Sequence, residues 1–108
     1  MYQKTLKIIL TPNYFLNFTI NAINDLELIY NYCFNISRSY YNKIRREFYN
    51  HLSLISYNPF ACQKLQSNLE RFKDCRRCIC SNFIIVYRIY DNFVEIINIF
   101  YSKSNYIR

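Results

Sequence analysis

The hydrophobic positions in the last third of the chain follow the pattern of β-strands. Residues 75–106 are rich in β-branched and aromatic side chains, which favour extended structure. Two polar pairs, Ser81-Asn82 and Asp91-Asn92, interrupt this stretch where hairpin turns are expected. The pattern therefore predicts three strands joined by two tight turns. A further strand is predicted at residues 4–10, ended by Thr11-Pro12.

Apolar residues at three- and four-residue spacing predict two amphipathic helices in the middle of the chain. The first begins at about Ile20 with Thr19 or Asn21 as its cap, and the second runs from a break at residues 35–37 to about Ser56. Their apolar faces comprise Ile23, Leu26, Ile29, Tyr30 and Cys33, then Tyr41, Ile44, Phe48, Leu52 and Ile55. A break this short favours an antiparallel helical hairpin. Asn58-Pro59 ends the second helix, because a residue before proline avoids helical geometry.

The order of these elements predicts an α+β fold. We expect an antiparallel helical hairpin packed on one face of a small, mainly antiparallel four-stranded sheet. At 108 residues, the chain is expected to form a single domain over 1–108. Residues 13–19 have no clear pattern, and residues 60–74 are expected to be a connecting loop with one helical turn.

The turn positions predict which residues face each other across the sheet. With Asp91-Asn92 as a two-residue turn, Arg88 lies opposite Glu95 and Val86 lies opposite Ile97. The face expected to pack under the helices then collects Ile85, Tyr87, Ile89, Val94 and Ile96.

The other face of the predicted sheet is basic and partly aromatic, and it is expected to be uncovered. A turn at Ser81-Asn82 puts Arg77 on the face of Arg88, and strict alternation adds Tyr101 and Lys103. Two interpretations stay open: a binding or catalytic surface, or a solvated sheet face with a surface Arg88–Glu95 ion pair worth less than about 1 kcal/mol.

Basic residues outnumber acidic ones by 14 to 7, which gives the chain a net charge of +7. They crowd the second helix and the approach to the sheet, and five of them are candidate binding residues: Arg45, Arg46, Arg76, Arg77 and Arg88. This balance favours a nucleic acid, a nucleoprotein or an acidic protein segment as partner. The alternative is a solvated face that keeps the protein in solution.

The five cysteines, an odd number, favour free thiols over a disulfide framework. Together with the lack of a signal-peptide pattern or a membrane-spanning stretch, this favours a cytoplasmic protein. Cys75, Cys78 and Cys80 suggest zinc, but in a strand Cys75 points away from the other two, and His51 is the only histidine. Buried thiols are the better interpretation, so no metal or cofactor is expected.

Several segments resemble toxins of the RelE/ParE superfamily. The resemblance covers the pattern A-x-x-D-L-x-x-I-x-x-Y from Ala22 to Tyr32, the Asn58-Pro59 pair, and residues 82–101. It implies the toxin of a type II toxin–antitoxin system, as in plasmid stabilisation, with two antiparallel helices on an antiparallel sheet and a small cognate antitoxin wrapped around it. RelE-like members cleave mRNA on the ribosome, whereas ParE-like members inhibit DNA gyrase.

The resemblance favours the ParE-like branch. RelE-like members usually carry Arg at the position of Ile84, His is common at Tyr101, and Arg is common at Lys103 and Ser104. A ribosome-dependent endoribonuclease would need a base and cations to stabilise the phosphorane charge. Its catalytic residues would be Tyr101, Lys103, Arg77 and Arg88.

We therefore expect a non-hydrolytic gyrase inhibitor, neutralised by an antitoxin with an acidic segment that folds on binding. An mRNA endoribonuclease, a degenerate family member and a general nucleic-acid-binding module are the alternatives. Whether the protein is an enzyme is left open.

Overall fold

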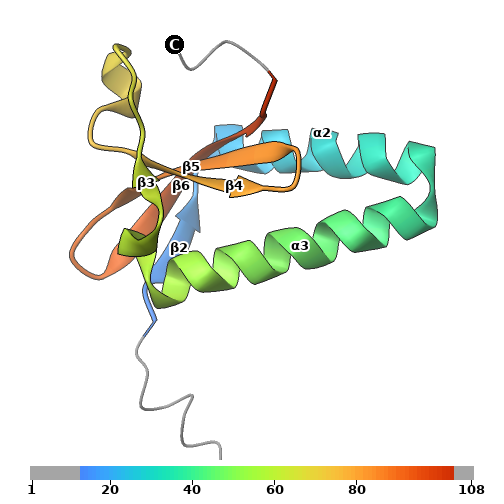
Figure 1. Cartoon of the computed structure of the whole chain (residues 1–108), viewed down its shortest axis with the longest axis horizontal. Coiled ribbons are helices and arrows are strands. Elements are labelled where there is room, and N and C mark those ends of the chain that lie inside the picture. The colour runs from blue at the N-terminus through green and yellow to red at the C-terminus, as the bar shows by residue number, and fades with distance from the viewer. Residues whose placement is uncertain (1–12, 104–108) are drawn as a thin grey trace, which may run out of the picture.

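Two long helices and a five-stranded sheet make up the fold, which confirms the predicted α+β class (Figure 1). The computed structural model describes residues 13–103, so the strand predicted at residues 4–10 lies outside the described part. The elements run in the order β2 (Phe15–Phe18), α2 (Ile20–Ile36), α3 (Arg38–Tyr57), η1 (Pro59–Ala61), β3 (Gln63–Lys64), η2 (Glu70–Phe72), β4 (Arg76–Cys80), β5 (Phe83–Ile89) and β6 (Phe93–Tyr101).

The helical hairpin is confirmed, and Thr19, one of the two predicted caps, begins its first helix. The Thr19 hydroxyl accepts a hydrogen bond from the Ala22 amide at 3.1 Å and so caps α2. Ser37 ends α2 by donating its amide to the Cys33 carbonyl at 3.1 Å, and its hydroxyl caps α3 by accepting from the Tyr40 amide at 3.0 Å. One extended residue therefore closes one helix and opens the next, which returns α3 alongside α2.

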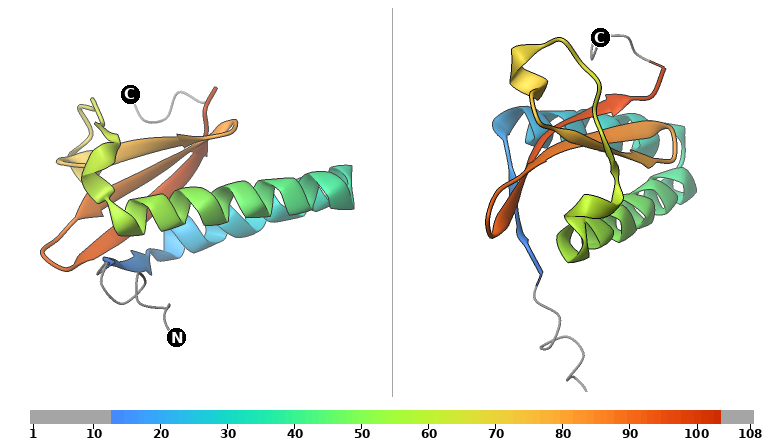
Figure 2. Two further views of the ribbon diagram at one scale, coloured as in Figure 1. Left: turned by 60° about the horizontal axis from the view of Figure 1, so that its bottom comes forward. Right: turned by 60° about the vertical axis from the view of Figure 1, so that its left-hand side comes forward.

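The main core lies between the helices and one face of the sheet (Figure 2). The helices contribute Ala22 and Cys33 from α2, and Ile44, Phe48 and Ile55 from α3. The sheet contributes the apolar face predicted for it, with Ile85, Tyr87, Val94 and Ile96 buried and Ile89 half-buried. Burying a large apolar side chain stabilises a fold by roughly 1.5–3 kcal/mol, so this layer is the main source of stability. Ile23 departs from the expected face and is 42% exposed.

The sheet has five strands in the order β2-β6-β5-β4-β3, so the prediction of four strands was wrong. Residues 13–19, which had no clear pattern, contain β2, which pairs parallel with β6. The segment 60–74, expected to be a loop with one helical turn, contains two short 3-10 helices and β3. With two residues, β3 is too short to show periodicity and is defined by its antiparallel pairing with β4.

A β-bulge in β6 changes the predicted register. Arg88 lies opposite Glu95 as expected, but Val86 lies opposite Asn98 and not opposite Ile97, because Ile97 is an extra residue in β6. Beyond the bulge the two faces exchange. The prediction that Tyr101 shares the face of Arg88 was therefore wrong: Tyr101 lies opposite Phe83, with 6.0 Å between the ring centroids, on the helix side.

The second face of the sheet is partly covered, contrary to expectation. The segment between β3 and β4 folds back over it and inserts Phe72, which packs edge-to-face on Phe100 at 5.8 Å between ring centroids. Cys75, Ile84 and Val86 join this smaller core. The segment carrying η2 lies on the side of the sheet opposite the helices (Figure 2).

Where β2 ends, a side chain of α2 takes over the pairing with β6. The Asp25 carboxylate accepts hydrogen bonds from the Ile99 amide at 2.9 Å and from the Asn98 side-chain amide at 3.0 Å. The Ile99 amide would otherwise stay unpaired at the edge of the strand. Asp25 therefore fastens α2 to the sheet.

We expect Asp25→Ala to lower the free energy of unfolding by about 2 kcal/mol, because two donors lose a charged acceptor. Urea denaturation of the variant and the parent protein measures the effect. Glu27→Ala is the matched control, since it removes an exposed carboxylate from the same helix. Equal stability of the two variants would show that Asp25 does not fasten the edge.

Candidate functional site

Arg88, a predicted catalytic and binding residue, has a structural role in the fold. Its guanidinium donates to the main-chain carbonyls of Arg71 at 3.0 Å and of Lys73 at 2.9 and 3.1 Å. Glu95 lies 3.9 Å from the same group, so the predicted cross-strand ion pair is present. The donors of Arg88 thus hold the segment that carries Phe72 against the sheet.

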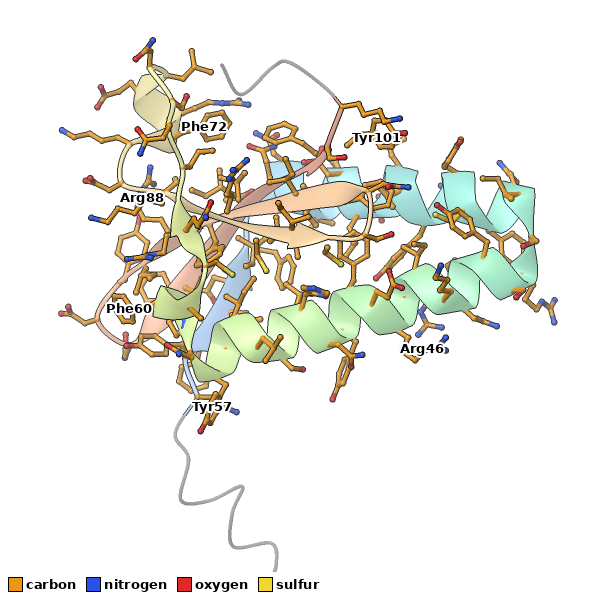
Figure 3. All side chains as sticks on the ribbon, in the orientation of Figure 1. Arg46, Tyr57, Phe60, Phe72, Arg88 and Tyr101 are labelled. Atoms are coloured by element: carbon orange, nitrogen blue, oxygen red, sulfur yellow. The ribbon has the colours of Figure 1, made fainter. Side chains whose placement is uncertain are left out.

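The four residues of the nuclease hypothesis are not brought together. Figure 3 shows Arg88 beside Phe72 and Tyr101 far from both. Arg77 lies opposite Val86, on the Arg88 face as predicted, whereas Tyr101 lies on the helix face. Lys103 lies in the turn that follows β6. Their roles stay predictions, but they do not form one surface.

Arg76 is also engaged locally. Its guanidinium donates to the carbonyl oxygens of Cys62 at 2.7 Å and of Phe60 at 3.3 Å. The same group lies over the Phe60 ring, 5.4 Å from the centroid, which is a favourable cation–π distance. Arg76 therefore anchors the chain that follows α3.

Burial raises the pKa of several tyrosines and cysteines that belong to the main core or pack against it. It raises the pKa of the Tyr30 and Tyr40 hydroxyls above the ordinary value. It also raises the pKa of Tyr87, whose hydroxyl donates to the Pro59 carbonyl at 2.7 Å, and raises that of Cys80 to about 12. These groups keep their protons near neutral pH, so none of them is prepared to act as a general base.

Arg45 and Arg46 lie on a side of α3 that we call the α3 strip, in which every residue is exposed except the half-buried Leu52: Asn42, Arg45, Arg46, Tyr49, Leu52 and Ser53. Three- and four-residue steps put these residues on one side of the helix. A shallow hollow is lined by Asn42, the two arginines and Tyr49. Arg45 lies over the Tyr41 ring, 5.4 Å from its centroid, which orients its charge.

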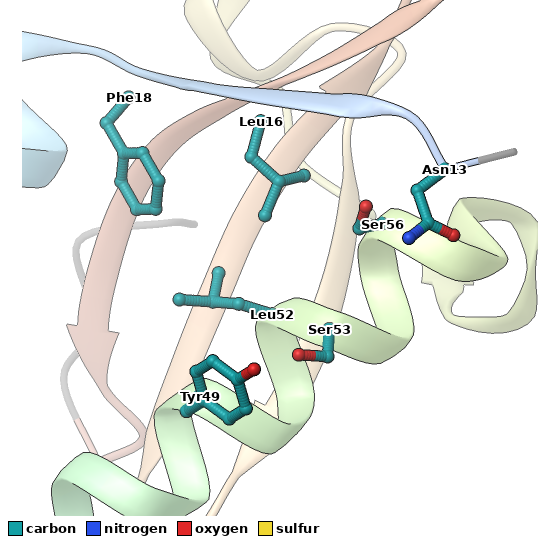
Figure 4. Close-up of a pocket in the computed structure, with 7 residues that line it drawn as sticks. All are labelled: Asn13, Leu16, Phe18, Tyr49, Leu52, Ser53 and Ser56. Carbon is teal, nitrogen blue, oxygen red and sulfur yellow. The ribbon is translucent and has the colours of Figure 1, made fainter. Parts of the chain in front are cut away.

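A second hollow continues the α3 strip toward β2 (Figure 4). Leu16 and Phe18 of β2 face Leu52 and Tyr49 of α3 across it. Two hydrogen bonds between Ser56 and Tyr14 close its polar end. The Ser56 hydroxyl donates to the Tyr14 carbonyl at 2.7 Å, and the Tyr14 amide donates to the Ser56 carbonyl at 2.9 Å. Because Tyr49 borders both hollows, the basic and apolar parts form one continuous surface.

Most of the charged residues of α3 are basic. The helix carries four basic residues, Arg38, Lys43, Arg45 and Arg46, against the single acid Glu47. Tyr49 adds a large aromatic ring that is 72% exposed. Exposed aromatic and arginine side chains are enriched in protein interfaces, so this surface suits an acidic protein partner.

The cysteines follow the arrangement expected of buried thiols. All five are free, with Cys78 and Cys80 in the main core and Cys75 in the smaller core on the other face. Within residues 13–103, no cluster of three or more potential metal ligands is found. In the same part of the chain, no helix is long and apolar enough to cross a membrane.

Comparison with known proteins decides the family. The family model "ParE toxin of type II toxin-antitoxin system, parDE" matches residues 16–106, which is most of the chain. The chain belongs to the ParE toxin family. This confirms the superfamily resemblance and the ParE-like branch, and it makes the protein a toxin component of a type II toxin–antitoxin system.

A solved structure shares the fold of this ParE toxin. It is described as the chromosomal ParDE toxin–antitoxin system from P. aeruginosa, with a TM-score of 0.67 and 17% sequence identity. The match covers 83% of this chain and 97% of the other. At this identity the likeness establishes the fold. A search of curated proteins found no match.

The apolar hollow between β2 and α3 was largely missed by the sequence analysis, which placed only Leu52 on an apolar helix face. Arg45 and Arg46 stood out by charge, whereas Tyr49 was not singled out. Its signal in the sequence is its position, since a residue three and four positions after Arg46 and Arg45 lies on the same side of a helix as the two arginines. Leu16 and Phe18 had no signal, because the strand that carries them was not predicted.

We expect Arg88→Ala to loosen the segment over the second face of this ParE toxin and to cost on the order of 1–2 kcal/mol, since three hydrogen bonds from a partly exposed charge are lost. Trypsin should then cleave faster after Arg71 and Lys73. Arg46→Ala is the control, because it removes an exposed arginine from α3 and leaves both cleavage sites in place. Unchanged cleavage in Arg88→Ala would contradict this role.

Proposed function

We propose that this ParE toxin arrests growth in the cytoplasm by binding DNA gyrase, without hydrolysing nucleic acid, and that a cognate antitoxin neutralises it. Family membership supports the toxin role. The observation that carries the non-hydrolytic proposal is the separation of Tyr101 from Arg77 and Arg88 by the bulge in β6. A base and cations that lie on opposite faces of a sheet cannot act on one phosphate.

The α3 strip is the proposed binding surface. Among the described residues, Arg45 and Arg46 form no hydrogen bond or ion pair, so their charges are available to a partner. Arg76 and Arg88, in contrast, are held by main-chain carbonyls. The adjoining apolar hollow adds surface for a side chain of a protein partner. An acidic segment of the antitoxin, folding on binding, would complement the same charge.

Induced expression in a bacterial host tests the proposed target. We expect growth arrest with intact mRNA and an induced DNA-damage response, and inhibition of supercoiling when the purified toxin is added to gyrase. Arrest with rapid mRNA cleavage at ribosome-occupied codons would overturn the proposal in favour of an endoribonuclease. Soluble protein that causes no arrest would indicate a degenerate member.

The variants Tyr101→Phe and Lys103→Ala sharpen this test. Toxicity that persists in both agrees with non-hydrolytic binding. Loss of mRNA cleavage with retained fold would instead make these residues catalytic.

We expect Arg45→Glu and Arg46→Glu each to weaken target binding about tenfold or more, because each reverses a charge at the centre of the proposed interface. Supercoiling inhibition over a range of toxin concentrations measures the loss. Lys73→Glu is the control, since it makes the same charge change on the segment covering the other face of the sheet. Equal loss in all three variants would show that net charge matters and the α3 strip does not.

A further inference from the structure

Two cysteines stand opposite each other at the β3 edge of the sheet. In the antiparallel pairing of β3 and β4, Gln63 lies opposite Arg77 and Lys64 opposite Arg76. Extending this register by one residue puts Cys62 opposite Cys78. The backbone dihedral angles of Cys62 are extended, with φ −89° and ψ 159°, although the chain bends at this residue, just before β3 begins. The Cys62 side chain is a close neighbour of the Cys78 thiol.

The type of pairing suits a bond between the two sulfurs. The Leu65 amide donates to the Cys75 carbonyl at 2.8 Å, which makes Leu65 and Cys75 a hydrogen-bonded pair. Such pairs alternate with non-hydrogen-bonded ones, in which Cα atoms are typically about 4.5 Å apart, and the register extended to Cys62 and Cys78 gives a position of this kind. A disulfide requires Cα atoms about 4.4–6.8 Å apart. The two residues therefore need little movement to be joined.

Neighbouring contacts hold this geometry in place. The Arg76 guanidinium donates to the Cys62 carbonyl at 2.7 Å, and the buried Tyr87 hydroxyl donates to the Pro59 carbonyl at 2.7 Å. Both bonds fix the segment that follows α3 against the sheet. Cys62 is half-buried and reachable from solvent, whereas Cys78 is 7% exposed behind it.

We propose that Cys62 and Cys78 are a redox site of this protein, in which a hydroperoxide oxidises Cys62 and Cys78 then closes an intramolecular disulfide. In the first step the Cys62 thiolate attacks one oxygen of hydrogen peroxide; the O–O bond breaks and leaves a sulfenic acid and hydroxide, which becomes water with the proton that Cys62 gave up. In the second step the Cys78 sulfur attacks the Cys62 sulfur and the S–O bond breaks. The hydroxyl departs as water with the proton of Cys78. Two thiols are oxidised and hydrogen peroxide is reduced to two waters.

The other cysteines are unsuited to these roles. Cys33, Cys75 and Cys80 are at most 1% exposed. Cys75 lies on the other face of the sheet, and Cys80 pairs with Phe83 across the turn. Burial also raises the pKa of Cys78 and Cys80 to about 12, so these thiols stay protonated and the first attack falls to Cys62.

Limited oxidation of the reduced full-length protein with hydrogen peroxide tests the proposal. Trypsin cleavage after Arg46, Lys64, Arg77 and Arg88, followed by mass spectrometry without reductant, should yield peptide 47–64 linked to peptide 78–88. Titration should show the loss of two of the five free thiols, in a monomer lighter by two hydrogen atoms. Dithiothreitol should restore both thiols.

Matched cysteine variants distinguish the partners. The peptide 78–88 holds both Cys78 and Cys80, so Cys80→Ala should keep the link and Cys62→Ala should abolish it. A link that disappears in Cys80→Ala would overturn the assignment to Cys78. Oxidation of Cys62 to sulfinic acid, or a disulfide between two molecules, with Cys78 left as a thiol would overturn the proposal itself. None of these outcomes depends on the target of the toxin.

Discussion

The structure depends on covering both faces of β5. Five consecutive residues of this strand, from Phe83 to Tyr87, are buried, so neither face can be left to water. The helices cover one face with a continuous apolar layer. The other face is covered by a short segment that fully buries one large side chain, Phe72, with the half-buried Leu65 beside it, so this segment has little apolar surface of its own to hold it. Arg88 supplies the missing attachment through main-chain carbonyls.

The helices and the hairpin turns could be predicted because their signals are local. A 3.6-residue period and a capping hydroxyl identify α2 and α3, since each depends on residues a few positions apart. The turn at Ser81-Asn82 was found from its polar pair, although Ser81 adopts φ 57°, a conformation that glycine adopts more easily. Local polarity marked the turn even without the residue best suited to it.

The bulge, the fifth strand and the role of Arg88 could not be predicted, because each depends on partners remote in sequence. A prediction from strict alternation of the two faces assumes that every residue of β6 has one partner in β5, but Ile97 has none. The apolar side chain of Ile97 gives no warning of this, because it suits a paired position as well as a bulge. The acceptors of Arg88 are main-chain carbonyls, which no side-chain pattern reveals. Charge alone therefore singled out Arg45 and Arg88 equally, although Arg45 is exposed and Arg88 holds the segment around Phe72 against the sheet.

The bulge is fixed by the start of α2, which connects the fold to the chemistry available on its surface. Thr19 donates its amide to the Ile96 carbonyl at 3.0 Å and its hydroxyl to the Ile97 carbonyl at 2.7 Å, while Asp25 holds the Ile99 amide just beyond. These contacts hold β6 on both sides of the extra residue. Removing the bulge would require breaking them, because a shift of one residue exchanges the two faces of the strand. The contacts that cap α2 therefore also keep Tyr101 on the opposite face of the sheet from Arg77 and Arg88.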